Sequence, residues 1–229
     1  ILIFINHEYF ALANSKFKMK KLDLVSGIGV NYNKFTPVSI QKKVEKRTHL
    51  SLTDRDSVLI YVGELSKRKN QMVLIESMAD VLKKHPNTYL LLVGRGSLKS
   101  EYKEKISNLG LSEHVRLLGY RDDIAELMQI SDIALSSSLQ EGLPVNLMEA
   151  MGTGLPLIVS NCRGNSDLVE NQVNGMIVSE NTKENWTKAI CELLDAPQCL
   201  ERYGQSSLEK STMYSEETVM KEMHEIYNR

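Results

Sequence analysis

From about residue 57, short runs of apolar residues alternate with longer segments in which apolar positions recur at helical spacing. The short runs predict strands at 57–63, 88–94, 115–119, 132–137, 156–160 and 175–178. The longer segments predict helices at 70–84, 97–109, 122–130, 143–151 and 165–171. Strands that are apolar throughout are covered on both faces, so this alternation predicts an α/β fold with a doubly wound, Rossmann-like parallel sheet.

The flanking segments differ from this pattern. Residues 1–30 open with the apolar run ILIFI, which has nothing before it to pair with, and they begin with Ile, so we interpret the chain as a fragment of a longer one. Residues 31–56 are polar and charged and are predicted to be a connector. The main domain is predicted at 57–213 and an amphipathic helix at 214–229, where the following apolar residues recur at helical spacing: Val219, Met220, Met223, Ile226 and Tyr227.

Composition narrows the classes of protein that fit. Of 229 residues, 42% are hydrophobic and 25% charged, which is typical of an ordinary globular protein. A net charge of -1 argues against a nucleic-acid partner. Three widely spaced cysteines predict neither a disulfide framework nor a zinc site and favour a reducing compartment. No apolar run approaches the roughly 20 residues that span a bilayer.

Three loops are predicted at one edge of the sheet. In an open parallel sheet, ligands bind beyond the carboxyl ends of the strands, where loops lead into helices. The loops 64–70, 120–123 and 138–144 all follow predicted strands. We therefore expect the candidate chemistry to lie there.

The third loop contains the sequence SLQEGLPVNLMEAM, residues 138–151. Gly142 permits backbone dihedrals that a side chain would forbid, and Pro144 suits the first turn of a helix. Free N–H groups at residues 142–146 would then point into the crevice at the positive end of the helix dipole. Such a helix start predicts an anion site suited to phosphate.

Two glutamates, Glu141 and Glu149, flank this helix start. Both would repel a phosphate, so if they are functional they should accept hydrogen bonds from hydroxyl groups, as a carboxylate does from a vicinal diol. A ligand with a central phosphate and a diol at each end is a nucleotide sugar. The alternatives are a solvated helix carboxylate for Glu149 and a charge beside a turn for Glu141.

Other motifs give weaker indications. The basic cluster 67–69 is either a solvated loop or a pyrophosphate site. Gly94-Arg95-Gly96 follows a strand like a dinucleotide fingerprint, but Lys99 stands where the third glycine belongs, so NAD is not predicted. Asp54 and Asp56 have the spacing of a metal-binding pair but precede their strand, so a polar turn is predicted and no metal site.

These motifs together resemble glycosyltransferase family 4. Its signature is similar to EGLPVNLMEAMGTGLPLIVSNCRGNSDLVENQVNG, its first strand and phosphate loop to YVGELSKRKN, and its interdomain segment to GIGVNYNKFTP. The resemblance implies a GT-B fold, in which two Rossmann-like domains face a cleft. This chain is similar to the C-terminal, donor-binding half of bacterial capsular or exopolysaccharide transferases. Residues 1–30 would then be the last strand and helix of the N-terminal acceptor domain and the start of the crossover.

The resemblance also implies roles for individual residues. Lys69 and Glu141 would be catalytic, holding the phosphate and the transferred sugar. Donor contacts are implied for the amides of the stretch from Gly142 through Leu143 and Pro144 to Val145, for Glu149 at the ribose, and for Tyr120 and Arg121 at the base. The family usually has Arg where this chain has Glu64, and we take Arg68 as the hypothetical replacement.

The implied enzyme is a retaining, metal-independent glycosyltransferase without a cofactor. It would move a sugar from a nucleotide sugar to a glycan or lipid-linked acceptor in polysaccharide biosynthesis, with the acceptor bound through the missing N-terminal domain. The implied location is cytoplasmic, and peripheral association of the full-length enzyme with the inner face of the membrane is compatible with it. The alternatives are a sugar-nucleotide epimerase of GT-B architecture and a non-catalytic nucleotide-sugar-binding domain. We expect the fragment alone to bind donor and transfer nothing.

Overall fold

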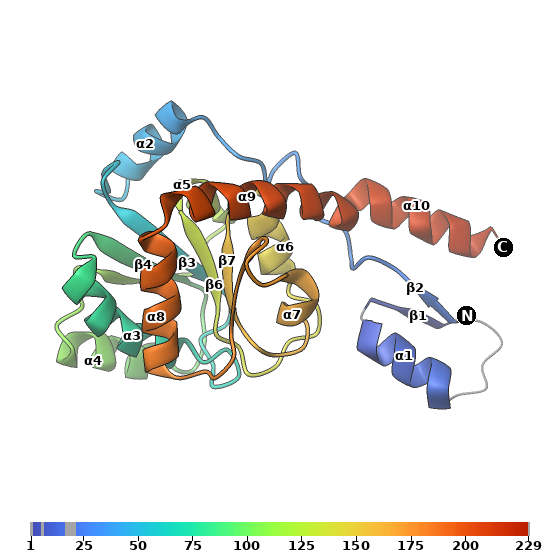
Figure 1. The fold of residues 1–229 in the computed structure, drawn as a ribbon, viewed down its shortest axis with the longest axis horizontal. Helices are drawn as coiled ribbons and strands as arrows, with labels where there is room; N and C mark the ends of the chain where they lie inside the picture. Colours follow the sequence, from blue (N-terminus) through green and yellow to red (C-terminus); the bar gives the residue numbers. More distant parts are fainter. Residues whose placement is uncertain (1, 6, 17–21, 229) are drawn as a thin grey trace.

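The computed structural model describes residues 2–5, 7–16 and 22–228. Its main body is a parallel six-stranded sheet in the order β5-β4-β3-β6-β7-β8 (Figure 1). The strands are β3 (Ser57–Val62), β4 (Thr88–Val93), β5 (Val115–Gly119), β6 (Ile133–Ser136), β7 (Leu157–Ser160) and β8 (Gly175–Val178). The predicted doubly wound α/β fold is confirmed, and each predicted strand is correct to within one residue at each end.

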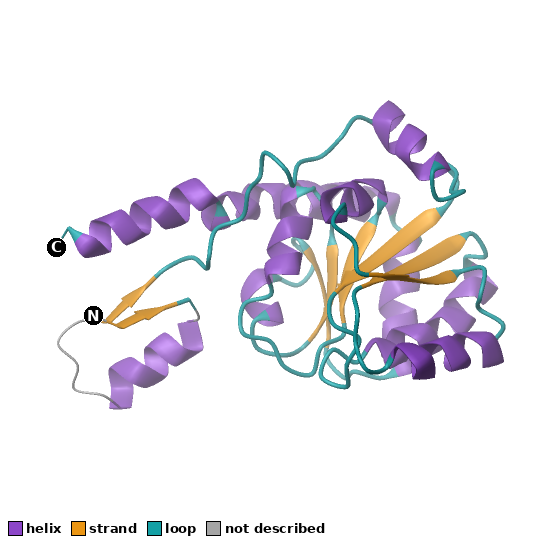
Figure 2. Ribbon diagram, turned by 180° about the vertical axis from the view of Figure 1, so that it is seen from behind, coloured by secondary structure: helices purple, strands orange, loops and turns teal. Residues whose placement is uncertain are grey.

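Helices cover both faces of this sheet, as Figure 2 shows from behind. One core lies under α3 (Gln71–Lys84), α4 (Lys99–Asn108) and α8 (Lys183–Leu194), and the other lies under α5 (Ile124–Ile130) and α6 (Val145–Gly152). Strand β3 serves both, because Leu59 and Tyr61 enter the first core while Val58 and Ile60 enter the second. This alternation explains why the central strands are apolar at every position.

The predicted connector contains a helix that the sequence pattern did not predict, α2 (Ile40–Thr48). It starts at Ser39, whose side chain accepts a hydrogen bond from the Lys42 N–H. Its inner face carries Lys43 and Arg47 in place of an apolar stripe, and both pair with Asp132 beside α5. Ion pairs attach this helix to the main domain, and a search for apolar periodicity does not detect a helix of this kind.

Helix α7 (Asn165–Leu168) is shorter than the predicted 165–171. Val169 is already extended, and the Asn174 side-chain amide donates to the Leu168 carbonyl, replacing the next helical hydrogen bond.

The described residues among the first 30 form a small unit with one more strand than predicted. Strand β1 (Leu2–Phe4) pairs in parallel with β2 (Leu22–Leu24), and α1 (His7–Lys16) lies between them in sequence. In Figure 1 this unit lies beside α10 (Glu216–Tyr227), which follows α9 (Pro197–Ser211) and the turn Thr212–Tyr214. The backbone N–H and hydroxyl of Ser26 both donate to Glu222 of α10, over 2.7 and 2.8 Å.

Only part of the predicted apolar stripe of α10 is covered. Val219 and Ile226 are buried, whereas Met220 and Tyr227 are largely exposed. The buried stripe is therefore narrower than the sequence pattern indicated.

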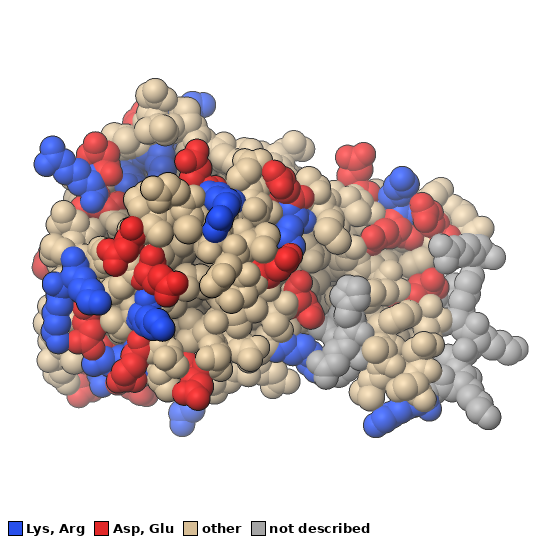
Figure 3. Space-filling view, viewed as in Figure 1, with Lys and Arg blue, Asp and Glu red and all other residues tan. Residues whose placement is uncertain are grey.

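Charged side chains of both signs alternate over the face shown in Figure 3. Among the described residues, no helix combines the length and the apolar composition that crossing a bilayer requires.

Candidate functional site

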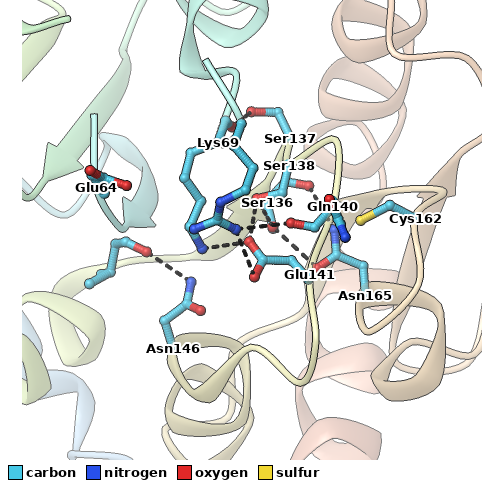
Figure 4. A network of polar contacts seen from close by, with 12 residues as sticks. Glu64, Lys69, Ser136, Ser137, Ser138, Gln140, Glu141, Asn146, Cys162 and Asn165 are labelled. Atoms are coloured by element: carbon cyan, nitrogen blue, oxygen red, sulfur yellow. Dashed lines mark hydrogen bonds and ion pairs between the residues drawn. The ribbon is translucent and has the colours of Figure 1, made fainter. Parts of the chain in front are cut away.

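The loops after β3 and β6 meet at the carboxyl edge of the sheet, because these two strands are neighbours (Figure 4). The Leu139 N–H donates to the Arg68 carbonyl over 2.8 Å, which ties one loop to the other. The point between β3 and β6 is where the strand order reverses direction. In doubly wound folds this is the usual ligand-binding crevice.

An ion pair lies at the centre of this edge. Lys69 Nζ is 2.5 Å from Glu141 Oε1, and the two side chains are only 12% and 8% exposed. Arg68 Nη1 lies 3.5 Å from Glu141 Oε2 and donates to the Gln140 carbonyl over 3.0 Å. The structure thus brings together three residues that the sequence analysis placed in one site, from loops 72 residues apart.

Buried hydroxyl groups that the sequence analysis did not single out lie next to this pair. Ser138 Oγ donates to Glu141 Oε1 over 2.6 Å, and the Tyr61 hydroxyl is 2.8 Å from Ser138 Oγ. Ser138 stands three residues before Glu141, which is the only indication of it in the sequence.

Helix α6 begins at Val145, two residues later than the predicted 143, so Pro144 precedes the first turn instead of lying in it. Pro144 is its N-cap residue and has no side chain that could cap it. The N–H groups of Leu143, Val145 and Asn146 donate to no other residue in the part of the chain that the structure describes. Pro144 has no N–H, so the predicted row from 142 to 146 is interrupted there. The remaining donors suit an anion at the positive end of the helix.

Gly142 does not use the backbone freedom that a glycine permits. Gly142 is not among the described glycines with positive φ, and a Cβ built on it would meet nothing within 4 Å. The close approach is at Gly164, which has φ 83° and whose Cβ would lie 2.3 Å from the Gly142 carbonyl oxygen.

Glu149 lies on the second turn of α6 and is partly buried. Burial raises the pKa of its carboxyl group from 4.5 to about 7, and the positive charge of Lys34 opposes this shift. Among the described residues, no side chain is within ion-pair or hydrogen-bond distance of this carboxylate. Glu149 is therefore a poorly compensated acceptor, in keeping with a group that awaits hydroxyl donors.

Glu149 should make stability fall as the pH rises from about 4.5 to about 7. The folded state keeps a proton in this range that the unfolded state has already lost, so each further rise in pH favours unfolding. Glu149→Gln removes this dependence and should make the protein more stable at pH 8 by about 1–2 kcal/mol, a value reduced for partial exposure. Urea unfolding of both proteins at pH 4.5, 6 and 8 measures it. An unchanged difference at all three pH values would contradict the assignment.

The residues implied for the base are less closely grouped. Tyr120 is 67% exposed, and the Arg95 guanidinium lies over its ring, 5.1 Å from the centroid. Arg121 forms a two-point pair with Asp123, with Nε 2.7 Å from Oδ1, and this guanidinium lowers the pKa of the Asp123 carboxyl. The Arg121 side chain is thus already paired with Asp123, so a contact with a base would come from the Arg121 backbone.

Glu64, the departure from the family pattern, lies apart from the Lys69–Glu141 pair in Figure 4. Its side chain is exposed, and its backbone carbonyl accepts a hydrogen bond from Gln71 Nε2 over 2.8 Å. Arg68, by contrast, reaches Glu141 directly.

Cavity volume does not locate the site. A hollow of about 440 Å³ is lined by Lys34, Lys46, Asp122, Asp123 and residues of α5, and it includes neither Lys69 nor Glu141. Within the described ranges, no three His, Cys, Asp or Glu side chains are grouped as metal ligands would be. The site is therefore assigned from its charges and hydrogen-bond donors.

Solved structures with the same fold include proteins named as glycosyltransferases. HepE from Anabaena, crystallised in complex with UDP and glucose, superposes with a TM-score of 0.89 at 22% identity, over 100% of this chain and 63% of HepE. WaaG, a glycosyltransferase involved in lipopolysaccharide biosynthesis, superposes with a TM-score of 0.83 at 19% identity, over 98% of this chain and 62% of WaaG. The fold is therefore that of GT-B glycosyltransferases.

Sequence relatives agree with this fold. The chain is 32% identical over 204 residues to the putative glycosyltransferase EpsD of Bacillus subtilis, over 89% of this chain and 54% of EpsD. It is 33% identical over 170 residues to an Escherichia coli galactosyltransferase named for UDP-Gal and GlcNAc-diphosphoundecaprenol, over 73% of this chain and 44% of that enzyme. The chain thus spans about half the length of these relatives. The family model for glycosyl transferases group 1 matches residues 42–210, well over half of the chain, so the chain belongs to this family of glycosyltransferases.

Proposed function

We propose that this chain is the donor-binding part of a retaining, metal-independent glycosyltransferase of family 4. The whole protein would move a sugar from a nucleotide sugar to a glycan or lipid-linked acceptor in polysaccharide biosynthesis. The observation that carries the proposal is the buried Lys69–Glu141 pair beside the start of α6. A cation and free amides would meet the phosphates, and carboxylates would meet the hydroxyl groups at each end of the donor.

Each group then has a distinct role. Glu141 would accept hydrogen bonds from the transferred sugar, and Glu149, on the second turn of α6, from the ribose. Lys69, Arg68 and the free N–H groups at the start of α6 would hold the diphosphate. Tyr120, with Arg95 over its ring, and the backbone at Arg121 would lie at the base.

The chemical step would proceed on one face of the sugar. The bond from the anomeric carbon to the diphosphate oxygen would break while an acceptor hydroxyl attacks from the same side, and the hydroxyl proton would pass to the leaving diphosphate oxygen as the new carbon–oxygen bond forms. Negative charge would then grow on the leaving oxygen, where Lys69 and the α6 amides would stabilise it. Fixed donors stabilise such charge without having to reorganise.

The relatives suggest the first probes. The names of two of them refer to UDP or UDP-Gal, so UDP is the first nucleotide to test. The lipid diphosphate in the name of the E. coli enzyme makes a lipid-linked acceptor the first acceptor class, to be bound through the rest of the whole protein. This would place the enzyme in the cytoplasm, with the whole protein peripherally associated with the inner face of the membrane.

Calorimetric titration of this chain with UDP, GDP, ADP and NAD tests the donor site. We expect one nucleoside diphosphate to bind, and Glu149→Ala to weaken it by about tenfold or more, since charge-assisted hydrogen bonds to the ribose are lost. The matched control is Glu104→Ala, an exposed glutamate on α4, which should change nothing. Binding of NAD in place of a nucleoside diphosphate would contradict the proposal. It would also be contradicted if none of the four nucleotides bound to either this chain or the whole protein.

Product analysis of the whole protein separates the alternatives. A transferase releases nucleotide only as it glycosylates an acceptor, whereas an epimerase converts the donor sugar without any acceptor. A non-catalytic binding protein leaves the donor unchanged with every acceptor.

A further inference from the structure

The Ser138 hydroxyl lies next to the carboxylate of Glu141 (Figure 4), and the Tyr61 hydroxyl lies next to Ser138 in turn. Ser138 is 0% exposed and Tyr61 is 1% exposed. We propose that Ser138 and Tyr61 are positioning residues, which orient Glu141 so that one of its oxygens holds Lys69 and the other faces the transferred sugar. The inference rests on the proposed function and deepens it, because it says how a catalytic carboxylate is aimed.

The direction of the hydrogen bonds follows from counting hydrogens. Each hydroxyl carries one hydrogen, and the Glu141 carboxylate can only accept, so Ser138 donates its hydrogen to Glu141 Oε1 over 2.6 Å. Tyr61 must then donate to Ser138 Oγ, 2.8 Å away. The Lys69 carbonyl oxygen, 3.2 Å from the Tyr61 hydroxyl, shares that hydrogen. One phenol therefore contacts both loops that form the ion pair.

The two oxygens of Glu141 have different surroundings. Oε1 accepts from Lys69 Nζ at 2.5 Å and from Ser138 Oγ at 2.6 Å, which uses both of its lone pairs. Oε2 has Arg68 Nη1 at 3.5 Å and no closer partner among the described residues. Oε2 is thus the oxygen left to accept from a sugar hydroxyl.

Ser138 is itself fixed from the next strand. Ser160, at the end of β7, donates to the Ser138 carbonyl over 2.5 Å, and Asn165 Nδ2 donates to Ser160 Oγ over 3.1 Å. With its backbone held there, the Ser138 side chain is aimed at Glu141. A buried network whose members are all satisfied favours a single arrangement, and here that arrangement sets the rotamer of Glu141.

The test compares a nucleotide with its sugar conjugate. The probes are UDP with UDP-glucose and UDP-galactose, or the GDP or ADP equivalents if one of those nucleotides is the one that binds. Ser138→Ala should weaken binding of the sugar conjugate by about tenfold and leave the nucleotide within about twofold, because Glu141 faces the sugar while the ribose and phosphates have other partners. Tyr61→Phe should give the same pattern at about threefold, since it acts through Ser138.

Two matched variants control for the loss of a buried hydroxyl. Ser77 is 0% exposed and bonds the Val73 carbonyl, and Tyr102 is 0% exposed and bonds Gln71 Oε1. Ser77→Ala and Tyr102→Phe should change neither affinity.

Equal weakening of nucleotide and conjugate, or no change in either, would overturn the inference, because a purely structural serine does not discriminate between them. If the wild-type chain binds none of the probes, the proposed function is what fails. The crystal structure of Ser138→Ala then decides the positioning role. A displaced Glu141 carboxylate supports it, and a carboxylate still within about 3 Å of Lys69 in its present rotamer overturns it.

Discussion

Lys69→Ala in the whole protein should lower kcat/KM by about 10- to 150-fold, which corresponds to losing one charge-assisted hydrogen bond of roughly 1.5–3 kcal/mol at the leaving phosphate. The side chain is 12% exposed and already points into the site, where it pairs with Glu141. A preorganised cation of this kind stabilises charge that develops in the transition state. Initial rates with saturating acceptor and varied donor measure the effect.

Three further variants are compared with Lys69→Ala. Lys183→Ala removes a partly exposed lysine that pairs with Asp80 of α3, outside the Lys69–Glu141 pair, and should leave the rate unchanged. Lys69→Arg keeps the charge and should recover part of the lost rate. The family usually has an arginine at the position of Glu64, and we hypothesise that Arg68 takes over its contact with the donor. Arg68→Ala should then weaken donor binding, and an unchanged donor affinity would remove that hypothesis. A loss below about threefold for Lys69→Ala would contradict its role.

Asp132→Ala should reduce the free energy of unfolding by about 3–5 kcal/mol. Asp132 Oδ2 accepts from Arg47 Nη2 over 2.7 Å and from the Val58 N–H over 2.8 Å, and Oδ1 accepts from Lys43 over 2.7 Å. The Arg47 side chain is 4% exposed, so the variant leaves a buried guanidinium without its counter-charge. Urea unfolding followed by circular dichroism measures the change.

Asp80→Ala is the matched control for Asp132→Ala. Asp80 also pairs with two cations, Lys83 and Lys183, but all three side chains are on the surface, so its loss should cost no more than about 1 kcal/mol. Donor affinity of folded Asp132→Ala should stay unchanged, because α2 and α5 do not contribute to the Lys69–Glu141 pair. A loss of stability no larger than that of Asp80→Ala would show that the Arg47 contacts to backbone carbonyls are sufficient without Asp132.

The strands could be predicted closely because their pattern is local. A parallel strand covered on both faces is apolar at every position, and this holds for β3 and β4 without reference to any partner. The start of α6 was visible to within two residues, since a Gly-Leu-Pro turn before a helical pattern indicates it locally.

Helix α2 and the glycine requirement were not visible, because both depend on distant partners. Arg47 reaches the Ile130 carbonyl and Asp132, 83 and 85 residues away, so its helix carries charges where a local pattern requires apolar residues. Gly142 stands in the turn itself but does not use the backbone freedom that a glycine permits. The close approach is made by Gly164, which comes from a different loop.

In the candidate site, too, some features depend on neighbouring residues and others on residues far apart in the sequence. The sequence by itself determined the sheet, the helix start and the spacing of Glu141 and Glu149, because each follows from neighbouring residues. Only the tertiary structure decided that Lys69 meets Glu141, 72 residues away, and that Tyr61 lies under Ser138, 77 residues away. These contacts exist because the strand order puts β6 beside β3, and strand order is set by the packing of the whole sheet, which no local pattern contains.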